Sequence, residues 1–159
     1  MNAPTVFRID FRPDVTLIPN VHRFVCEFFS SVLEGEDDAA RIGLTVFELL
    51  ENVVKYSLDG RGKLSVGVDG NIAEVRVKNR TTPECAAEIE RRVLELSNSS
   101  DPLGDYLRMM SRSVKEDSGA GGLGLARIRA EADMILTYES EGDEITLSAT
   151  GELTPRGLT

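Results

Sequence analysis

Two hairpin signals constrain the fold of this 159-residue chain more than any other feature. Each consists of two short segments in which apolar side chains alternate with polar or small ones, joined by a glycine-containing tight turn. The first joins 63–68 to 72–77 through Asp69-Gly70-Asn71, and the second joins 135–139 to 144–149 through Glu141-Gly142-Asp143. Because such short turns connect antiparallel strands, the pattern argues against a doubly wound parallel sheet.

Helical patterns fill most of the remaining chain. Apolar residues recur at intervals of three and four, and potential capping residues precede them at Asp37, Asp38, Thr82 and Asp101. Proline follows both Thr82 and Asp101, at the first position of the expected helix. Helices are predicted over about 18–33, 37–57, 82–96, 101–110 and 124–132, and one further strand over 6–11.

The order of these elements predicts an α+β fold. We expect a two-layer sandwich, in which a mixed and mostly antiparallel sheet carries its helices on one face. No internal repeat or linker divides the sequence, so residues 1–159 are predicted to form a single domain with a frayed tail over 154–159.

Composition narrows the classes of function. Eighteen Lys and Arg against 27 Asp and Glu give a net charge of −9, which disfavours binding to a nucleic acid backbone. No apolar run is long enough to span a membrane, and the N-terminus does not resemble a signal peptide, so a cytoplasmic protein is expected. The two cysteines, Cys26 and Cys85, are predicted to be reduced.

One helix carries a polar group of residues with chemical potential. Glu48, Asn52 and Lys55 stand at i, i+4 and i+7, so they share one helical face. A carboxylate can accept the proton of an attacking hydroxyl, an amide oxygen suits Mg²⁺, and an ammonium group can meet phosphate oxygens. The same spacing is also typical of the solvated face of an ordinary helix, and the spacing alone favours that interpretation, because polar helix faces are the rule.

A glycine-rich segment precedes the last predicted helix. Gly119, Gly121 and Gly124 read as G-x-G-x-x-G, and backbone N–H groups at a helix start can bind anions. A flexible connector explains the same glycines. A dinucleotide-binding site is disfavoured, because the polar stretch 111–118 stands where the motif requires a buried strand.

Together the two motifs resemble those of a known superfamily. The sequence from Glu48 to Tyr56, ELLENVVKY, is similar to the N box of the GHKL (Bergerat-fold) ATPases, and GAGGLGL from Gly119 is similar to their later glycine box. The resemblance covers about 37–149. In a chain of this size it is nearest to the stand-alone anti-sigma-factor Ser/Thr kinases and the SiaB-like kinases of bacterial partner switching.

The resemblance implies roles for individual residues. Glu48 would be the general base, Asn52 would bind Mg²⁺ and ATP, and Lys55 would lie near the phosphates. Backbone groups of the glycine box would bind the phosphates, with cofactor-binding positions at Gly119, Gly121, Gly122, Leu123 and Gly124.

Two further features follow from the same resemblance. The family has a D-x-G-x-G element whose Asp binds adenine, but this chain has Asn79 at the corresponding strand end and lacks both glycines. Residues 98–118 would form a lid over the triphosphate, and the candidates for its phosphate-binding cation are Arg108, Arg112 and Lys115.

The function implied is an ATP- and Mg²⁺-dependent protein Ser/Thr kinase that phosphorylates a STAS-like anti-anti-sigma protein and acts on a sigma-type regulator. Homodimerisation is also implied by the resemblance. The missing D-x-G-x-G element leaves a second hypothesis, a degenerate module that binds nucleotide weakly or not at all and sequesters a regulatory protein. A third is an ATPase without a protein acceptor.

Overall fold

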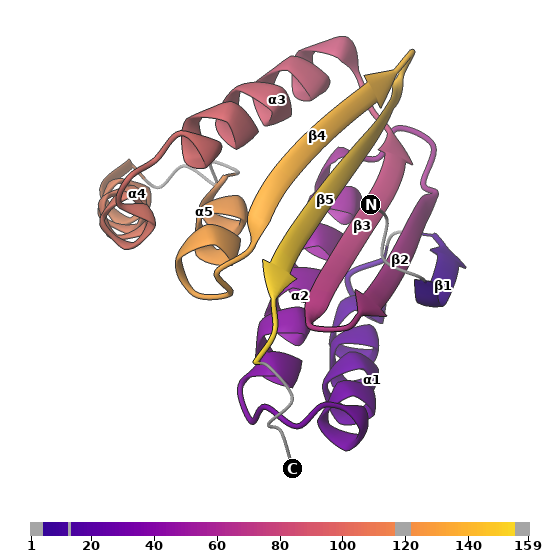
Figure 1. The fold of residues 1–159 in the computed structure, drawn as a ribbon. Helices are drawn as coiled ribbons and strands as arrows, with labels where there is room; N and C mark the ends of the chain where they lie inside the picture. Colours follow the sequence, from indigo (N-terminus) through magenta and orange to yellow (C-terminus); the bar gives the residue numbers. More distant parts are fainter. Residues whose placement is uncertain (1–4, 13, 117–121, 155–159) are drawn as a thin grey trace.

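The structure is a computed structural model that describes residues 5–12, 14–116 and 122–154. Its centre is a five-stranded sheet in the order β1-β2-β3-β5-β4, and all four pairings are antiparallel (Figure 1). The strands are β1 (Thr5–Phe11), β2 (Gly62–Asp69), β3 (Ile72–Arg80), β4 (Ile135–Glu141) and β5 (Glu144–Glu152). The predicted α+β class is confirmed, and the described sheet is antiparallel throughout rather than mixed.

Both predicted hairpins are present. Asp69 pairs with Ile72 across the first turn, and Glu141 pairs with Glu144 across the second. The turns contain Gly70 at φ +61° and Gly142 at φ +63°, a left-handed conformation that glycine adopts without steric cost. Local turn chemistry therefore sets the register of both strand pairs.

Five helices accompany the sheet: α1 (Leu17–Val32), α2 (Asp38–Tyr56), α3 (Pro83–Ser97), α4 (Pro102–Glu116) and α5 (Leu123–Ala130). The predicted caps of α3 and α4 are confirmed. Thr82 Oγ1 accepts a hydrogen bond from the Cys85 N–H at 3.2 Å, and Asp101 Oδ1 accepts one from the Gly104 N–H at 3.1 Å. The expected end of α4 near Met110 is wrong, because the helix continues through the polar residues to Glu116.

The predicted capping role of the aspartates before α2 is not met. Asp37 occupies the N-cap position but makes no side-chain cap hydrogen bond. Asp38 is only 2% exposed, and its Oδ2 accepts the Thr154 N–H at 2.8 Å. Thr154 is thus tied to the start of α2, whereas the rest of the predicted frayed tail, 155–159, lies outside the described residues.

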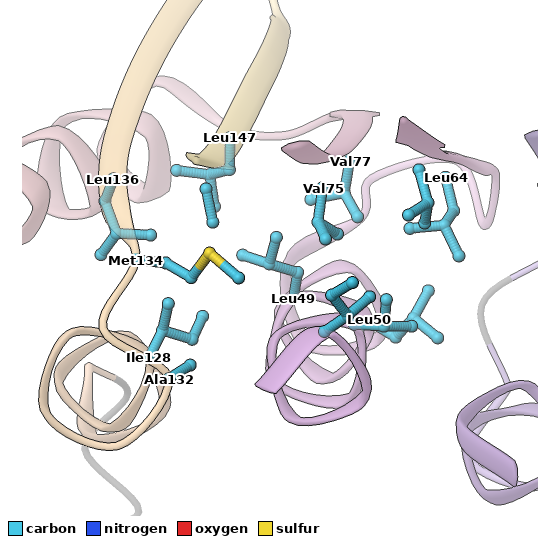
Figure 2. Close-up of a cluster of buried hydrophobic side chains, with 14 of the residues drawn as sticks. Leu49, Leu50, Leu64, Val75, Val77, Ile128, Ala132, Met134, Leu136 and Leu147 are labelled. Carbon is cyan, nitrogen blue, oxygen red and sulfur yellow. The ribbon is translucent and has the colours of Figure 1, made fainter. Parts of the chain in front are cut away.

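One hydrophobic core contains buried side chains of the sheet and of helices α1, α2, α3 and α5. Helices α1, α2 and α5 lie against the same face of the sheet (Figure 1). Figure 2 shows Leu49 and Leu50 of α2 pointing toward Val75 and Val77 of β3. All four side chains are at most 1% exposed, and each contributes roughly 1.5–3 kcal/mol through burial. The position of α2 on the sheet is therefore fixed by its apolar side. None of the described helices has the length and apolarity needed to cross a membrane.

Candidate functional site

Helix α2 carries the three polar residues selected from the sequence, and they differ in exposure. Glu48 is only 7% exposed, Asn52 is half-buried, and Lys55 is exposed. The Lys55 ammonium lies 5.6 Å from the centre of the neighbouring Tyr56 ring, within cation–π range. The polar face thus runs from the interior to the surface along about two helical turns.

A second charged residue reaches the buried carboxylate from α5. Nη1 of Arg127 donates to Oε1 of Glu48 at 3.1 Å, and Arg127 also donates through Nε to Oε2 of Glu131 at 2.9 Å. Burial raises the pKa of the Glu48 carboxyl above its ordinary value, although the hydrogen bond from Arg127 lowers it. The carboxylate is therefore a stronger base than an exposed glutamate. Sequence reasoning did not identify Arg127.

The glycine box meets the same carboxylate. Gly124 packs so closely against Glu48 that an added Cβ would overlap Oε2 and would lie 3.3 Å from Cδ. Only glycine fits at this position without moving the carboxylate. The structure therefore brings the N-box helix and the glycine box together. Gly119 and Gly121 lie outside the described residues.

The start of α5 has the backbone form expected of an anion-binding turn. Gly122 occupies the N-cap position with φ +107°, and Leu123 is the first helical residue. No side chain caps this end among the described residues, so its N–H groups are available to an anion at the positive end of the helix dipole. This geometry suits the roles predicted for Gly122, Leu123 and Gly124.

Asn52 supplies an observation that ordinary packing does not explain. Its Nδ2 is buried and has no hydrogen-bond partner in the described part of the chain. A buried polar group without a partner costs about 1–3 kcal/mol. A half-turn of the amide exchanges its nitrogen and oxygen, so the group can offer a donor to a phosphate or an acceptor to a cation. The residue therefore fits a site for Mg²⁺ and phosphate.

Asn79 lies at the end of β3 on the face that points to the core. It is 7% exposed, and its Nδ2 donates to the Arg80 carbonyl at 3.2 Å. Thr81 Oγ1 donates to the Tyr56 carbonyl at 2.8 Å and fixes this strand end beside the last turn of α2. Asn79 is therefore held near the end of α2, with one of its two amide N–H groups donated to the Arg80 carbonyl.

Helix α3 contributes a cation that the sequence analysis missed. Arg92 has a side chain only 16% exposed, and its Nε donates to Oε1 of Glu88 at 3.0 Å. Its Nη1 lies 3.5 Å from the Tyr56 hydroxyl, and a Cβ added to Gly122 would lie 2.9 Å from its Cδ. Arg92 thus stands between the end of α2 and the glycine turn.

The segment predicted to be a lid is mainly helix α4, which packs against α5. Arg108 is exposed and pairs with Asp105 one turn earlier. Arg112 lines a separate cavity of about 240 Å³ together with Glu95 and Met109. The third lid cation predicted from the sequence is Lys115, and its side chain lies outside the part of the chain that the structure describes. Arg92 of α3, by contrast, lies beside Gly122 of the glycine turn.

Comparison with known proteins identifies similar structures but no similar sequence. No protein-family model matches the chain, and no curated protein is significantly similar to it. A chain of the SiaB–SiaC complex from Pseudomonas aeruginosa superposes with a TM-score of 0.70 at 12% identity, over 92% of this chain and 89% of that chain.

Two histidine kinases match less well. For Acinetobacter baumannii AdeS the TM-score is 0.45 at 16% identity, over 93% of this chain and 68% of that chain. For the catalytic domain of the histidine kinase ThkA the TM-score is 0.43 at 15% identity, over 95% of this chain and 100% of that chain. The agreement with the SiaB–SiaC chain extends over nearly the whole of both chains, and at this identity it concerns the fold. The chain therefore has the fold of that chain of the SiaB–SiaC complex, in agreement with the predicted GHKL-type fold.

Proposed function

We propose that the chain is an ATP- and Mg²⁺-dependent protein Ser/Thr kinase of a partner-switching system, which phosphorylates a STAS-like antagonist protein. The supporting observation is the convergence of two distant segments. The buried Glu48 carboxylate packs against Gly124, and Asn52, one turn further along α2, has a buried amide nitrogen with no partner among the described residues. Similarity to a chain of the SiaB–SiaC complex supports a regulator that acts on a protein partner.

The described residues divide the work of phosphate binding. Backbone N–H groups from Gly122 to Gly124 would contact the phosphates, and Asn52 would hold Mg²⁺, which supplies charge neutralisation when bound. The described residues hold no group of three or more His, Cys, Asp or Glu side chains that could bind a metal. A Mg²⁺ beside Asn52 would therefore take further oxygens from the phosphates and water. Arg92 and Lys55 would add positive charge at the rim.

Glu48 would act as the general base. It would accept the proton of the Ser or Thr hydroxyl while that oxygen bonds to the γ-phosphorus, and the bond to the β–γ bridging oxygen breaks to release ADP. Its raised pKa suits this role, because a more basic carboxylate takes the proton more readily. Arg127 would act as a positioning residue, since its hydrogen bond directs one carboxylate oxygen.

Calorimetry with Mg·ATP and transfer of γ-labelled phosphate to STAS-domain proteins test this proposal. We expect Asn52→Ala to lose the Mg²⁺-dependent part of the binding, and Glu48→Gln to bind nucleotide but to lose at least about 100-fold in transfer. Asn20→Ala and Glu51→Gln, both exposed, are the matched controls. Equal activity in Glu48→Gln and Glu51→Gln would exclude Glu48 as the base. Phosphate release without any acceptor would favour a self-standing ATPase.

A second candidate function is a binding module that sequesters a regulatory protein without nucleotide chemistry. It is favoured by Asn79, which replaces the acidic adenine ligand of the family and already donates its amide N–H to the Arg80 carbonyl. A protein of this kind would give no heat with Mg·ATP and no nucleotide-dependent rise in melting temperature. It would still bind its partner, and Glu48→Gln would leave that affinity unchanged.

A further inference from the structure

The face of the sheet opposite the helices carries two neighbouring hollows. One, of about 440 Å³, lies at the ends of β1, β2 and β3, and the other, of about 330 Å³, lies across the strands next to it. Asp10, Lys63 and Lys78 line both, so the two hollows adjoin each other. No described helix covers this face (Figure 1).

The charge of this surface is opposite to that of the protein. Seven of the 18 Lys and Arg residues line the two hollows, but only four of the 27 Asp and Glu residues do. A protein with a net charge of −9 thus has one region in which cations outnumber acids. We name it the basic sheet face, represented by Arg8, Arg12, Arg61, Lys63, Arg76 and Lys78.

Internal ion pairs do not neutralise the basic sheet face. Lys78 pairs with Glu144 at 3.3 Å, and Arg80 pairs with Asp59 at 3.6 Å. Four of the lining cations have no ion pair among the described residues: Arg8, Arg12, Arg61 and Lys63. Only two of the lining acids, Asp10 and Glu139, lack an ion pair within the same described part of the chain. The surplus charge is therefore positive and available to a ligand.

We propose that the basic sheet face binds an acidic segment of a partner protein. Two adjoining hollows favour an extended chain over a small ion, and spaced carboxylates would match cations that are interleaved with Asp10 and Glu139. A nucleic acid is disfavoured, because its uniformly charged backbone would also meet these acids. Asn79 also lines the larger hollow, but the proposal rests on Arg8, Lys63 and the neighbouring cations and uses none of the groups assigned to phosphate chemistry, so it does not depend on the kinase activity.

Fluorescence anisotropy with a labelled peptide of about ten residues, in which glutamate alternates with serine, tests the proposal at low ionic strength. The overall charge of the protein repels this probe, so binding requires a local positive surface. We expect saturable binding that weakens as salt increases. Replacing Arg8 and Lys63 by Gln should weaken it about fivefold, because each exposed charge contributes about two- to threefold.

The double variant Arg23→Gln/Arg91→Gln is the matched control, since it removes two exposed cations outside the hollows. It should bind the peptide as the unmodified protein does, and circular dichroism should report the same fold for both variants. Absence of binding, or equal weakening in the control, would overturn the proposal. Tighter binding to a single-stranded oligonucleotide would assign the surface to nucleic acid instead. A salt-sensitive dimer lost only with Arg8 and Lys63 would make a second copy the occupant, which would also overturn it.

Discussion

Removing Arg127 should make the stability of the protein depend more strongly on pH. In Arg127→Met, Glu48 remains 7% exposed in the native fold but loses the guanidinium that donates to it at 3.1 Å. Loss of one partner of a fully buried ion pair costs about 3–5 kcal/mol. The Arg127 side chain is 39% exposed, so water screens part of the interaction, and we expect a loss of about 1–2 kcal/mol near pH 8.

The direction of the pH effect follows from the Glu48 pKa. Burial raises the folded pKa above the ordinary value of 4.5, so between the two values the native state holds more protons than the unfolded state. Stability therefore falls as the pH rises through this window. Arg127→Met removes a hydrogen bond that lowers the folded pKa, so the variant should be close to the unmodified protein near pH 5 and clearly less stable near pH 8.

Urea unfolding followed by circular dichroism at the two pH values measures this difference. The control is Arg91→Met, whose partners Glu88 and Glu95 are exposed, and its loss should be below about 1 kcal/mol and nearly equal at both pH values. Adding Glu48→Gln to Arg127→Met should restore most of the stability, since no buried charge remains. An equal loss for Arg127→Met at both pH values, with no restoration, would refute the argument.

Two further substitutions test the geometry around α2. Gly124→Ala should displace the Glu48 carboxylate and weaken Mg·ATP binding at least about tenfold in calorimetry. The free energy of unfolding should change by less than about 1 kcal/mol, because alanine favours the helix. Unchanged nucleotide affinity would contradict the proposed site. Thr81→Val removes the hydrogen bond to the Tyr56 carbonyl and should cost about 1–2 kcal/mol in urea unfolding. A stability equal to that of the unmodified protein would show that this bond does not hold the end of α2.

Local patterns were sufficient to predict most of the fold. The glycine turns and the Thr82 and Asp101 caps act within a few residues, so the local sequence is enough to predict them. Asp38 was misjudged because its partner, Thr154, is 116 positions away. The polar sequence after Met110 gave no apolar stripe, and α4 nevertheless continues to Glu116. An apolar stripe predicts only those helical residues that pack against a core, so this segment gave no helical signal.

The candidate site was predictable only in part. Glu48, Asn52 and Gly124 belong to motifs with characteristic spacing. Arg127 and Arg92 have no such signal, because ordinary surface helices also carry arginines with acidic residues four positions away, as both of these do. What distinguishes Arg127 is Glu48, 79 positions earlier in the chain, and that proximity arises only when α5 packs beside α2.

Helix α2 carries the Glu48 carboxylate and the Asn52 amide on the same rod as Leu49, Leu50 and Val53, which are at most 1% exposed. Because α2 moves as a rigid helix, a rotation or shift of its apolar side also moves its polar side. Any repacking of those apolar residues, in a natural variant or in a stabilised design, will therefore carry Glu48 and Asn52 with it. If Glu48 and Asn52 act as proposed, a change made to raise the melting temperature will also alter the geometry of the proposed phosphate site, so stabilised variants should be assayed for both properties.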